Sequence, residues 1–168
     1  MNRYTLAVLV RNQFGVLNRL TSMLRRRQFN ISSLAVSETE SPEFSRTTFS
    51  FDGDDVGKEQ LISQLYKLPD VISIKELNGE NSISCELMLI KMQNDPATRD
   101  DIRSTAEAFK AETIDYTRES ITLRLFGNGT YLDDFVSLMQ DYTILELCRT
   151  GTASLEKGSG ILRQNLNL

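Results

Sequence analysis

A short polar turn at residues 12–15 has the residue types and spacing to bind a small anion. It separates an apolar segment, 6–10, from an amphipathic segment that begins near Gly15. A strand that enters a helix through a glycine turn leaves unpaired backbone N–H groups at the positive end of the helix dipole. Gly15 lets a ligand approach the backbone, and the Asn12 amide can both donate and accept hydrogen bonds. The turn therefore suits a carboxylate or phosphate, or else a structural loop in which Asn12 caps the helix.

Residues for catalysis are scarce in this chain. It has no histidine, which is the commonest general base and transition-metal ligand, so Ser/His/Asp and Cys/His nucleophile systems are excluded. Cys85 and Cys148 form no CxxC pair, and we expect both to be buried free thiols. Carboxylate or lysine catalysis stays open, but nothing marks a site for it. We therefore expect a binding or regulatory protein and no catalytic residues.

Composition narrows the class of protein further. The 168 residues, 40% of them apolar, can form one ordinary domain or two small ones. A net charge of -4 does not favour nucleic acid or an anionic membrane as a partner. The chain shows neither a signal peptide nor an apolar run long enough for a bilayer, so we expect a cytoplasmic protein.

The elements that position the turn follow from hydrophobic periodicity. Residues 3–10 read as a central strand, and Val16, Leu20 and Leu24 share one stripe of a helix over about 15–27. Two strands, a second helix and a fourth strand follow before residue 78. This is the βαββαβ order of a ferredoxin-like fold. Its two helices cover one sheet face, so the other must contact solvent or be buried against something else.

The same element order is predicted a second time after a polar cluster at 78–82. We therefore expect an α+β protein of two consecutive ferredoxin-like domains, 1–77 and 83–168, joined by a linker at 78–82. The chain becomes polar after Gly151, and glycines at 158 and 160 predict a flexible tail from about 155.

Several motifs carry a resemblance to a known family. The run 11–19, Arg-Asn-Gln-Phe-Gly-Val-Leu-Asn-Arg, resembles the ligand turn of an ACT domain, an amino-acid-sensing module. Five further segments, in the same order as in the family, resemble the small regulatory subunit of acetolactate synthase (acetohydroxyacid synthase). They are 45–48, 64–71, 86–91, 114–115 and 149–151, and the similarity spans residues 3 to about 155.

The resemblance implies a function and a site. Such subunits bind and activate a large catalytic subunit that carries thiamine diphosphate, magnesium and usually FAD, while the small subunit itself holds no cofactor and no metal. They confer feedback inhibition by a branched-chain amino acid, most often valine, bound where two ACT domains form a homodimer. The matching positions are Asn12, Gly15, Val16 and Leu17 of one chain with Asn30 and Ile31 of its mate.

The aliphatic side chain of the effector would lie among Leu9, Val16 and Ile31. One methylene in an apolar pocket changes binding by only about 1–3 kcal/mol, so valine, leucine and isoleucine all remain candidates. Asn18, Gln28 and Ser32 depart from the family pattern beside this pocket. The alternative function is a stand-alone ACT-type sensor that regulates a different enzyme or transcription.

Overall fold

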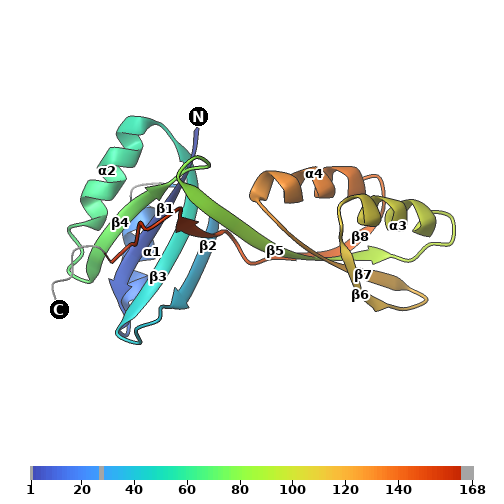
Figure 1. The fold of residues 1–168 in the computed structure, drawn as a ribbon, viewed down its shortest axis with the longest axis horizontal. Coiled ribbons are helices and arrows are strands. Elements are labelled where there is room, and N and C mark those ends of the chain that lie inside the picture. The colour runs from blue at the N-terminus through green and yellow to red at the C-terminus, as the bar shows by residue number, and fades with distance from the viewer. Residues whose placement is uncertain (1, 27–28, 164–168) are drawn as a thin grey trace. The chain divides into compact units, whose positions relative to one another are not determined.

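The computed structural model describes residues 2–26 and 29–163, and Figure 1 shows the fold of the chain. Gln28, one of the departures from the family pattern, lies outside the described residues, as does Arg27 at the end of the predicted first helix. Contacts divide the chain into two units. The first runs to Ser84 and resumes at Thr152, and the second is Cys85–Gly151.

The first unit has the predicted βαββαβ order. Its sheet order is β2-β3-β1-β4, and each pair of neighbours is antiparallel. The elements are β1 (Asn2–Arg11), α1 (Val16–Arg26), β2 (Ile31–Glu38), β3 (Phe44–Gly53), α2 (Asp55–Leu65) and β4 (Val71–Leu77).

The second unit repeats this order, which confirms the prediction of two ferredoxin-like folds. Its sheet order is β6-β7-β5-β8, and a short strand from the C-terminal segment, β9 (Ala153–Glu156), also pairs with β5. The elements are β5 (Ser82–Gln93), α3 (Arg99–Ala108), β6 (Glu112–Tyr116), β7 (Ser120–Gly127), α4 (Gly129–Met139) and β8 (Ile144–Arg149).

Each core lies between the helices and one face of its sheet. Leu6, Val8 and Val10 alternate along β1 and pack with Leu20 and other apolar residues of α1, α2 and β3. In the second unit Met88, Ile90 and Met92 of β5 form the equivalent row. None of the helices in the described part of the chain has the length and apolar character of a membrane-spanning segment.

The opposite face of the first sheet is covered by the C-terminal segment. Ala7 and Leu9 lie on this face, yet only 0% and 4% of their surfaces are exposed. Ser73 of β4 donates to the carbonyl of Leu162, and Lys75 forms an ion pair with Glu156. The chain therefore rejoins the first unit at Thr152, whereas the sequence predicted a flexible tail of the second domain. The segment packs there because its apolar residues, such as Leu162, cover this face of the sheet.

The prediction of buried cysteines is wrong. Cys85 and Cys148 are both exposed free thiols. Cys148 pairs in register with Leu89, which alternates with the core residues Met88 and Ile90. Strand alternation therefore turns the Cys148 side chain away from the helix-covered face.

Candidate effector-binding site

The turn between β1 and α1 requires glycine. Gly15 has φ +82°, in the left-handed region that residues with a Cβ rarely adopt. Its carbonyl accepts a hydrogen bond of 3.0 Å from the Arg19 N–H and so starts the helix.

Three backbone donors near the helix start remain free. The Val16 N–H donates to the Gln13 carbonyl at 3.3 Å, whereas the N–H groups of Gly15, Leu17 and Asn18 bond to none of the described residues. The first turn of α1 contains no acidic residue. A carboxylate at this helix start would meet unpaired donors and no acidic side chain from the first turn of α1.

Asn12 is not the cap of α1, contrary to the structural alternative. Its Nδ2 donates to Glu38 Oε1 at 3.1 Å and to the Pro42 carbonyl at 3.0 Å, and its backbone N–H donates to the Glu43 carbonyl at 2.7 Å. Asn12 therefore fastens the ligand turn to the β2–β3 connection. Its Oδ1 makes no hydrogen bond with a described residue, so it can accept one from a ligand.

A small hollow of about 120 Å³ lies beside this turn. Val16 and Leu17 both line it, and Val16 is buried whereas Leu17 is 44% exposed. Three of the predicted positions, Asn12, Val16 and Leu17, therefore line the hollow, and Gly15 lies in the adjoining turn. The lining residues include Val10, Gln13, Val16, Leu17, Leu20, Val36 and Thr47.

Leu9 does not belong to this hollow, so that part of the predicted pocket is wrong. It pairs in register with Arg46 and Ser73, and it lines a different cavity under the C-terminal segment. Val10 takes its place, because alternation along β1 puts residues 9 and 10 on opposite faces of the sheet.

Asn30 and Ile31 lie at the other end of the sheet. Ile31 pairs with Phe51, which pairs with Tyr4, whereas the turn follows Arg11 at the far end of β1. Seven strand residues separate those ends, which corresponds to roughly 23 Å. A site that combines Asn12 with Ile31 therefore needs two copies of the chain.

Arg19 and Asp70 support the turn and were missed as a pair. Arg19 Nε lies 2.8 Å from Asp70 Oδ2, and the Asp70 carbonyl accepts from the Arg11 N–H at 2.9 Å. Asp70 thereby ties the start of α1 to the end of β1. Apart from the family resemblance around 64–71, no sequence pattern predicts this pair, because the two residues are remote along the chain.

Comparison with known proteins identifies the family. A model of the AHAS small subunit-like ACT domain matches residues 6–73, and a model of the small subunit of acetolactate synthase matches residues 85–158. A probable acetolactate synthase small subunit from Archaeoglobus fulgidus is 40% identical over 157 residues, which are 94% of this chain and 98% of that protein. The chain belongs to the acetolactate synthase small subunit family.

Other members agree with this assignment. The acetolactate synthase small subunit of Mycolicibacterium smegmatis is 39% identical over 155 residues, covering 92% of this chain and 91% of its own length. The crystal structure of the acetolactate synthase small subunit from Thermotoga maritima superposes with a TM-score of 0.85 at 30% identity, covering 95% of this chain and all of that one. The resemblance drawn from the sequence motifs is confirmed.

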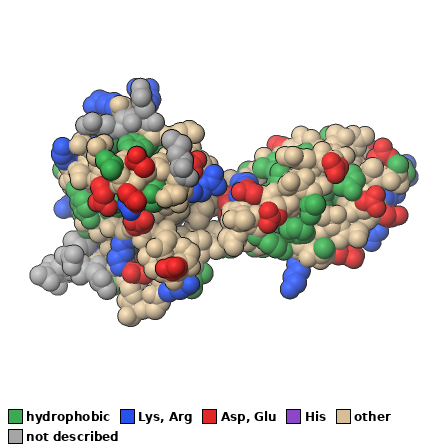
Figure 2. Space-filling view, turned by 90° about the horizontal axis from the view of Figure 1, so that it is seen from above, with side chains coloured by type: hydrophobic (Ala, Val, Ile, Leu, Met, Phe, Trp, Pro, Cys, Tyr) green, Lys and Arg blue, Asp and Glu red, His purple; other side chains and the backbone are tan. Residues whose placement is uncertain are grey.

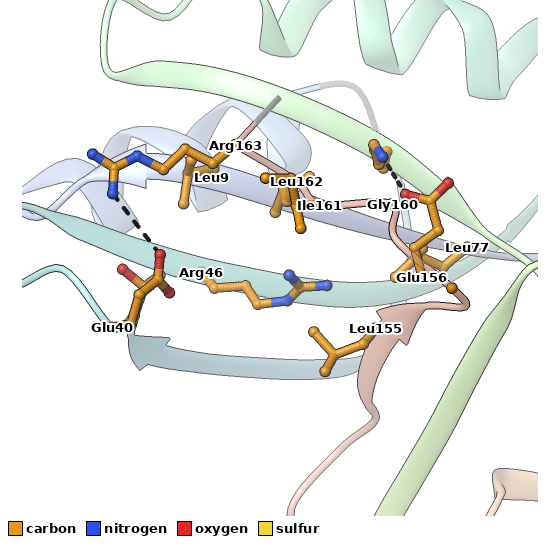
Figure 3. A pocket seen from close by; sticks show the side chains of 13 residues that line it. Leu9, Glu40, Arg46, Leu77, Leu155, Glu156, Gly160, Ile161, Leu162 and Arg163 are labelled. Atoms are coloured by element: carbon orange, nitrogen blue, oxygen red, sulfur yellow. Dashed lines mark hydrogen bonds and ion pairs between the residues drawn. The ribbon is translucent and has the colours of Figure 1, made fainter. Parts of the chain in front are cut away.

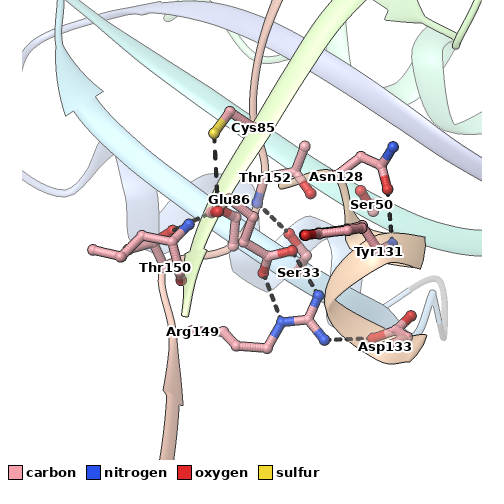
Figure 4. Close-up of polar contacts among 12 residues, drawn as sticks. Ser33, Ser50, Cys85, Glu86, Asn128, Tyr131, Asp133, Arg149, Thr150 and Thr152 are labelled. Carbon is pink, nitrogen blue, oxygen red and sulfur yellow. Dashed lines mark hydrogen bonds and ion pairs between the residues drawn. The ribbon is translucent and has the colours of Figure 1, made fainter. Parts of the chain in front are cut away.

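The second unit, Cys85–Gly151, lies wholly within the described residues and offers no comparable ligand turn. Asn128 Oδ1 accepts from the Tyr131 N–H at 2.8 Å, so the 127–130 turn is an ordinary helix cap. Beside it Arg149 binds Glu86 through two hydrogen bonds, of 3.1 and 2.7 Å, and also pairs with Asp133 (Figure 4). Arg149 thus pairs with both carboxylates, and we assign the cluster a structural role.

Figure 2 shows positive and negative side chains interspersed on the visible face of each unit.

Proposed function

We propose that this chain binds and activates the large catalytic subunit of an acetolactate synthase and makes it sensitive to valine or a related branched-chain amino acid. Thiamine diphosphate, magnesium and FAD would reside in the large subunit, with no cofactor in this chain. The observation that carries the proposal is the turn of the ACT domain, where Gly15 and Leu17 have free N–H groups and Leu17 lines a partly apolar hollow. An amino acid carries the matching groups, a carboxylate next to a short aliphatic side chain.

Each part of the effector has a partner at the turn. The N–H groups of Gly15 and Leu17 would hold the carboxylate, and Asn12 Oδ1 with the Glu38 carboxylate would accept from the ammonium. Charge-assisted hydrogen bonds contribute about 1.5–3 kcal/mol each. Two or three of them, less the cost of ordering, correspond to a dissociation constant in roughly the millimolar to micromolar range.

The second half of the site would come from a second copy. β2 is an edge strand of its sheet, and its residues Leu34 and Val36 are 37% and 44% exposed. Two β2 strands paired antiparallel about Leu34 and Ala35 would place Ile31 of one copy next to Glu38 of the other. Glu38 holds Asn12, so this homodimer would bring Asn30 and Ile31 of the second copy to the ligand turn.

A reconstitution assay tests the proposal. The purified chain alone should make no acetolactate, should raise the rate of its large subunit when mixed with it, and should make that rate fall on addition of valine, leucine or isoleucine. A chain that neither co-purifies with the large subunit nor stimulates it would overturn the proposal. Effector binding without any effect on the large subunit would instead favour the stand-alone sensor.

A further inference from the structure

A second, larger cavity lies on the other face of the first sheet, beneath the C-terminal segment (Figure 3). Its volume is about 370 Å³, within the range of roughly 300–1,000 Å³ typical of small-molecule sites. Its apolar wall comes partly from the sheet and partly from the C-terminal segment, as Leu9, Leu77, Leu155, Ile161 and Leu162. An aliphatic group in this space would lose part of its contact with water.

One of the basic side chains that line the cavity has no carboxylate partner among the described residues. Lys75 pairs with Glu156, and Arg163 lies 3.9 Å from Glu40 (Figure 3). Arg46 of β3 lies within 4.0 Å of no carboxylate of the described residues, and its Nη2 donates to the carbonyl of Ser154. Two acidic and three basic side chains therefore line the cavity, a local charge of one positive unit.

Arg46 is only partly hydrated in this position. Burial lowers the pKa of its guanidinium below the ordinary value, and the charge of Glu40 opposes this effect. The group stays protonated, because arginine in proteins does not lose its proton near neutral pH. A partly desolvated cation with unused N–H donors binds a carboxylate more strongly than a fully hydrated one does.

We propose that this cavity binds an aliphatic monocarboxylate, with Arg46 holding the carboxylate and the leucine and isoleucine side chains enclosing the hydrocarbon. A zwitterionic amino acid fits less well, because Glu40 and Glu156 already pair with basic side chains. Neither carboxylate is then free to accept a hydrogen bond from the ammonium group. The site is separate from the effector turn, since Leu9 and Val10 assign the two cavities to opposite faces of the sheet. A bound carboxylate would link β3 to the C-terminal segment and hold that segment in place.

The test is a titration of the full chain with 4-methylpentanoate, followed by the NMR signals of its leucine and isoleucine methyl groups. We expect saturable shifts at Leu155 and Ile161. The neutral isostere 4-methylpentanamide should bind at least tenfold more weakly, because it lacks the charge. Arg46→Met should weaken acid binding at least tenfold. Arg3→Met is the matched control on the same domain, because Arg3 lies outside the cavity and pairs with Asp52, and it should bind like the unmodified chain.

Equal binding of acid and amide, or unchanged binding by Arg46→Met, would overturn the proposal, as would shifts confined to Leu17 and Leu20, which line the hollow at the effector turn. If Arg46→Met does not fold, Leu155→Trp provides a second test, because this side chain is 62% exposed and a larger one would fill the cavity. It should abolish acid binding without loss of folded signals, and retained binding would contradict the site. Gly15→Asp should leave acid binding intact, so failure here and failure of the proposed effector site are distinguishable.

Discussion

Asn12 and Glu38 are joined by a hydrogen bond of 3.1 Å from Asn12 Nδ2 to Glu38 Oε1. The bond fixes the ligand turn, which follows β1, to the end of the edge strand β2. Because β2 is also the strand proposed to pair with a second copy, this contact would connect the proposed effector binding with the proposed dimer formation.

Asn12→Asp should destabilise the first unit by about 1–2 kcal/mol at pH 7, because a carboxylate cannot donate to Glu38 or to the Pro42 carbonyl and repels the Glu38 charge. Urea unfolding measures the change. Asn128→Asp is the matched control, because residue 128 only accepts a hydrogen bond, which aspartate can also do. Equal destabilisation by the two substitutions would contradict the assigned role of Asn12.

Gly15→Asp should abolish valine binding while the large subunit is still activated, because it adds bulk and negative charge at the carboxylate position. Gly15→Asn has the same shape without the charge and tolerates the positive φ better, so it should bind more strongly than Gly15→Asp. Gly79→Asp is the control, since a Cβ there meets no atom within 4 Å. Calorimetry measures all three, and unchanged valine affinity in Gly15→Asp would disprove the site.

Arg149→Met should destabilise the second unit by about 3 kcal/mol or more, because it leaves Glu86 buried without a counter-charge. The double variant with Glu86→Gln should recover part of this loss. Arg124→Met is the control, because its pair with Glu112 is much more exposed and should contribute less than about 1 kcal/mol. Chemical denaturation gives the values, and similar losses for both arginines would mean that Glu86 is not the cause.

A chain that ends at Gly151 should have a less stable first unit, because Ala7 and Leu9 lose their cover. Re-exposure of even one such leucine costs at least about 1.5 kcal/mol. Amide hydrogen exchange should be faster in β1 and β3 and unchanged in residues 85–151, which serve as the internal control. Unchanged protection of β1 would show that the C-terminal segment does not stabilise the sheet.

Lys58 should make the stability of the first unit depend on pH at both extremes. Its ammonium lies 3.0 Å from Glu76 and 3.2 Å from Asp55, and the hydrogen bond to Glu76 raises the pKa of Lys58. The bond from Lys58 lowers the pKa of Asp55, with a further contribution from Tyr4. A raised lysine pKa stabilises fully below its unfolded value, about 10.4, and this is lost as pH rises through the folded value. A lowered aspartate pKa stabilises above about 3.9, and this is lost as pH falls through the folded value.

Lys58→Met should therefore flatten the stability profile above about pH 10 and below about pH 4, near the ordinary pKa values of lysine and aspartate. Denaturant midpoints across the pH range measure this. Lys67→Met is the control, because Lys67 is exposed and forms no ion pair with a described residue. A profile that keeps its slope at both ends in Lys58→Met would contradict the assigned ion pairs.

The sequence by itself determined the two βαββαβ units, the turn at 12–15 and the family, because these depend on local signals. Alternation along β1, the apolar stripe of α1 and a glycine with a positive φ are all properties of neighbouring residues. The motifs from 11–19 to 149–151 were sufficient for the family resemblance, since they recur in the same order as in the known subunits.

Only the tertiary structure decided which groups meet. Asn12 is hydrogen-bonded to Glu38, and Arg19 forms an ion pair with Asp70. Leu9 lies on the sheet face opposite the effector turn, where the segment after Thr152 covers it. The tertiary structure also separated Ile31 from the ligand turn by the length of a strand. These contacts join residues far apart in the chain, and their free energy comes from burial and from pairing of charges after folding. Local periodicity carries no information about such pairings.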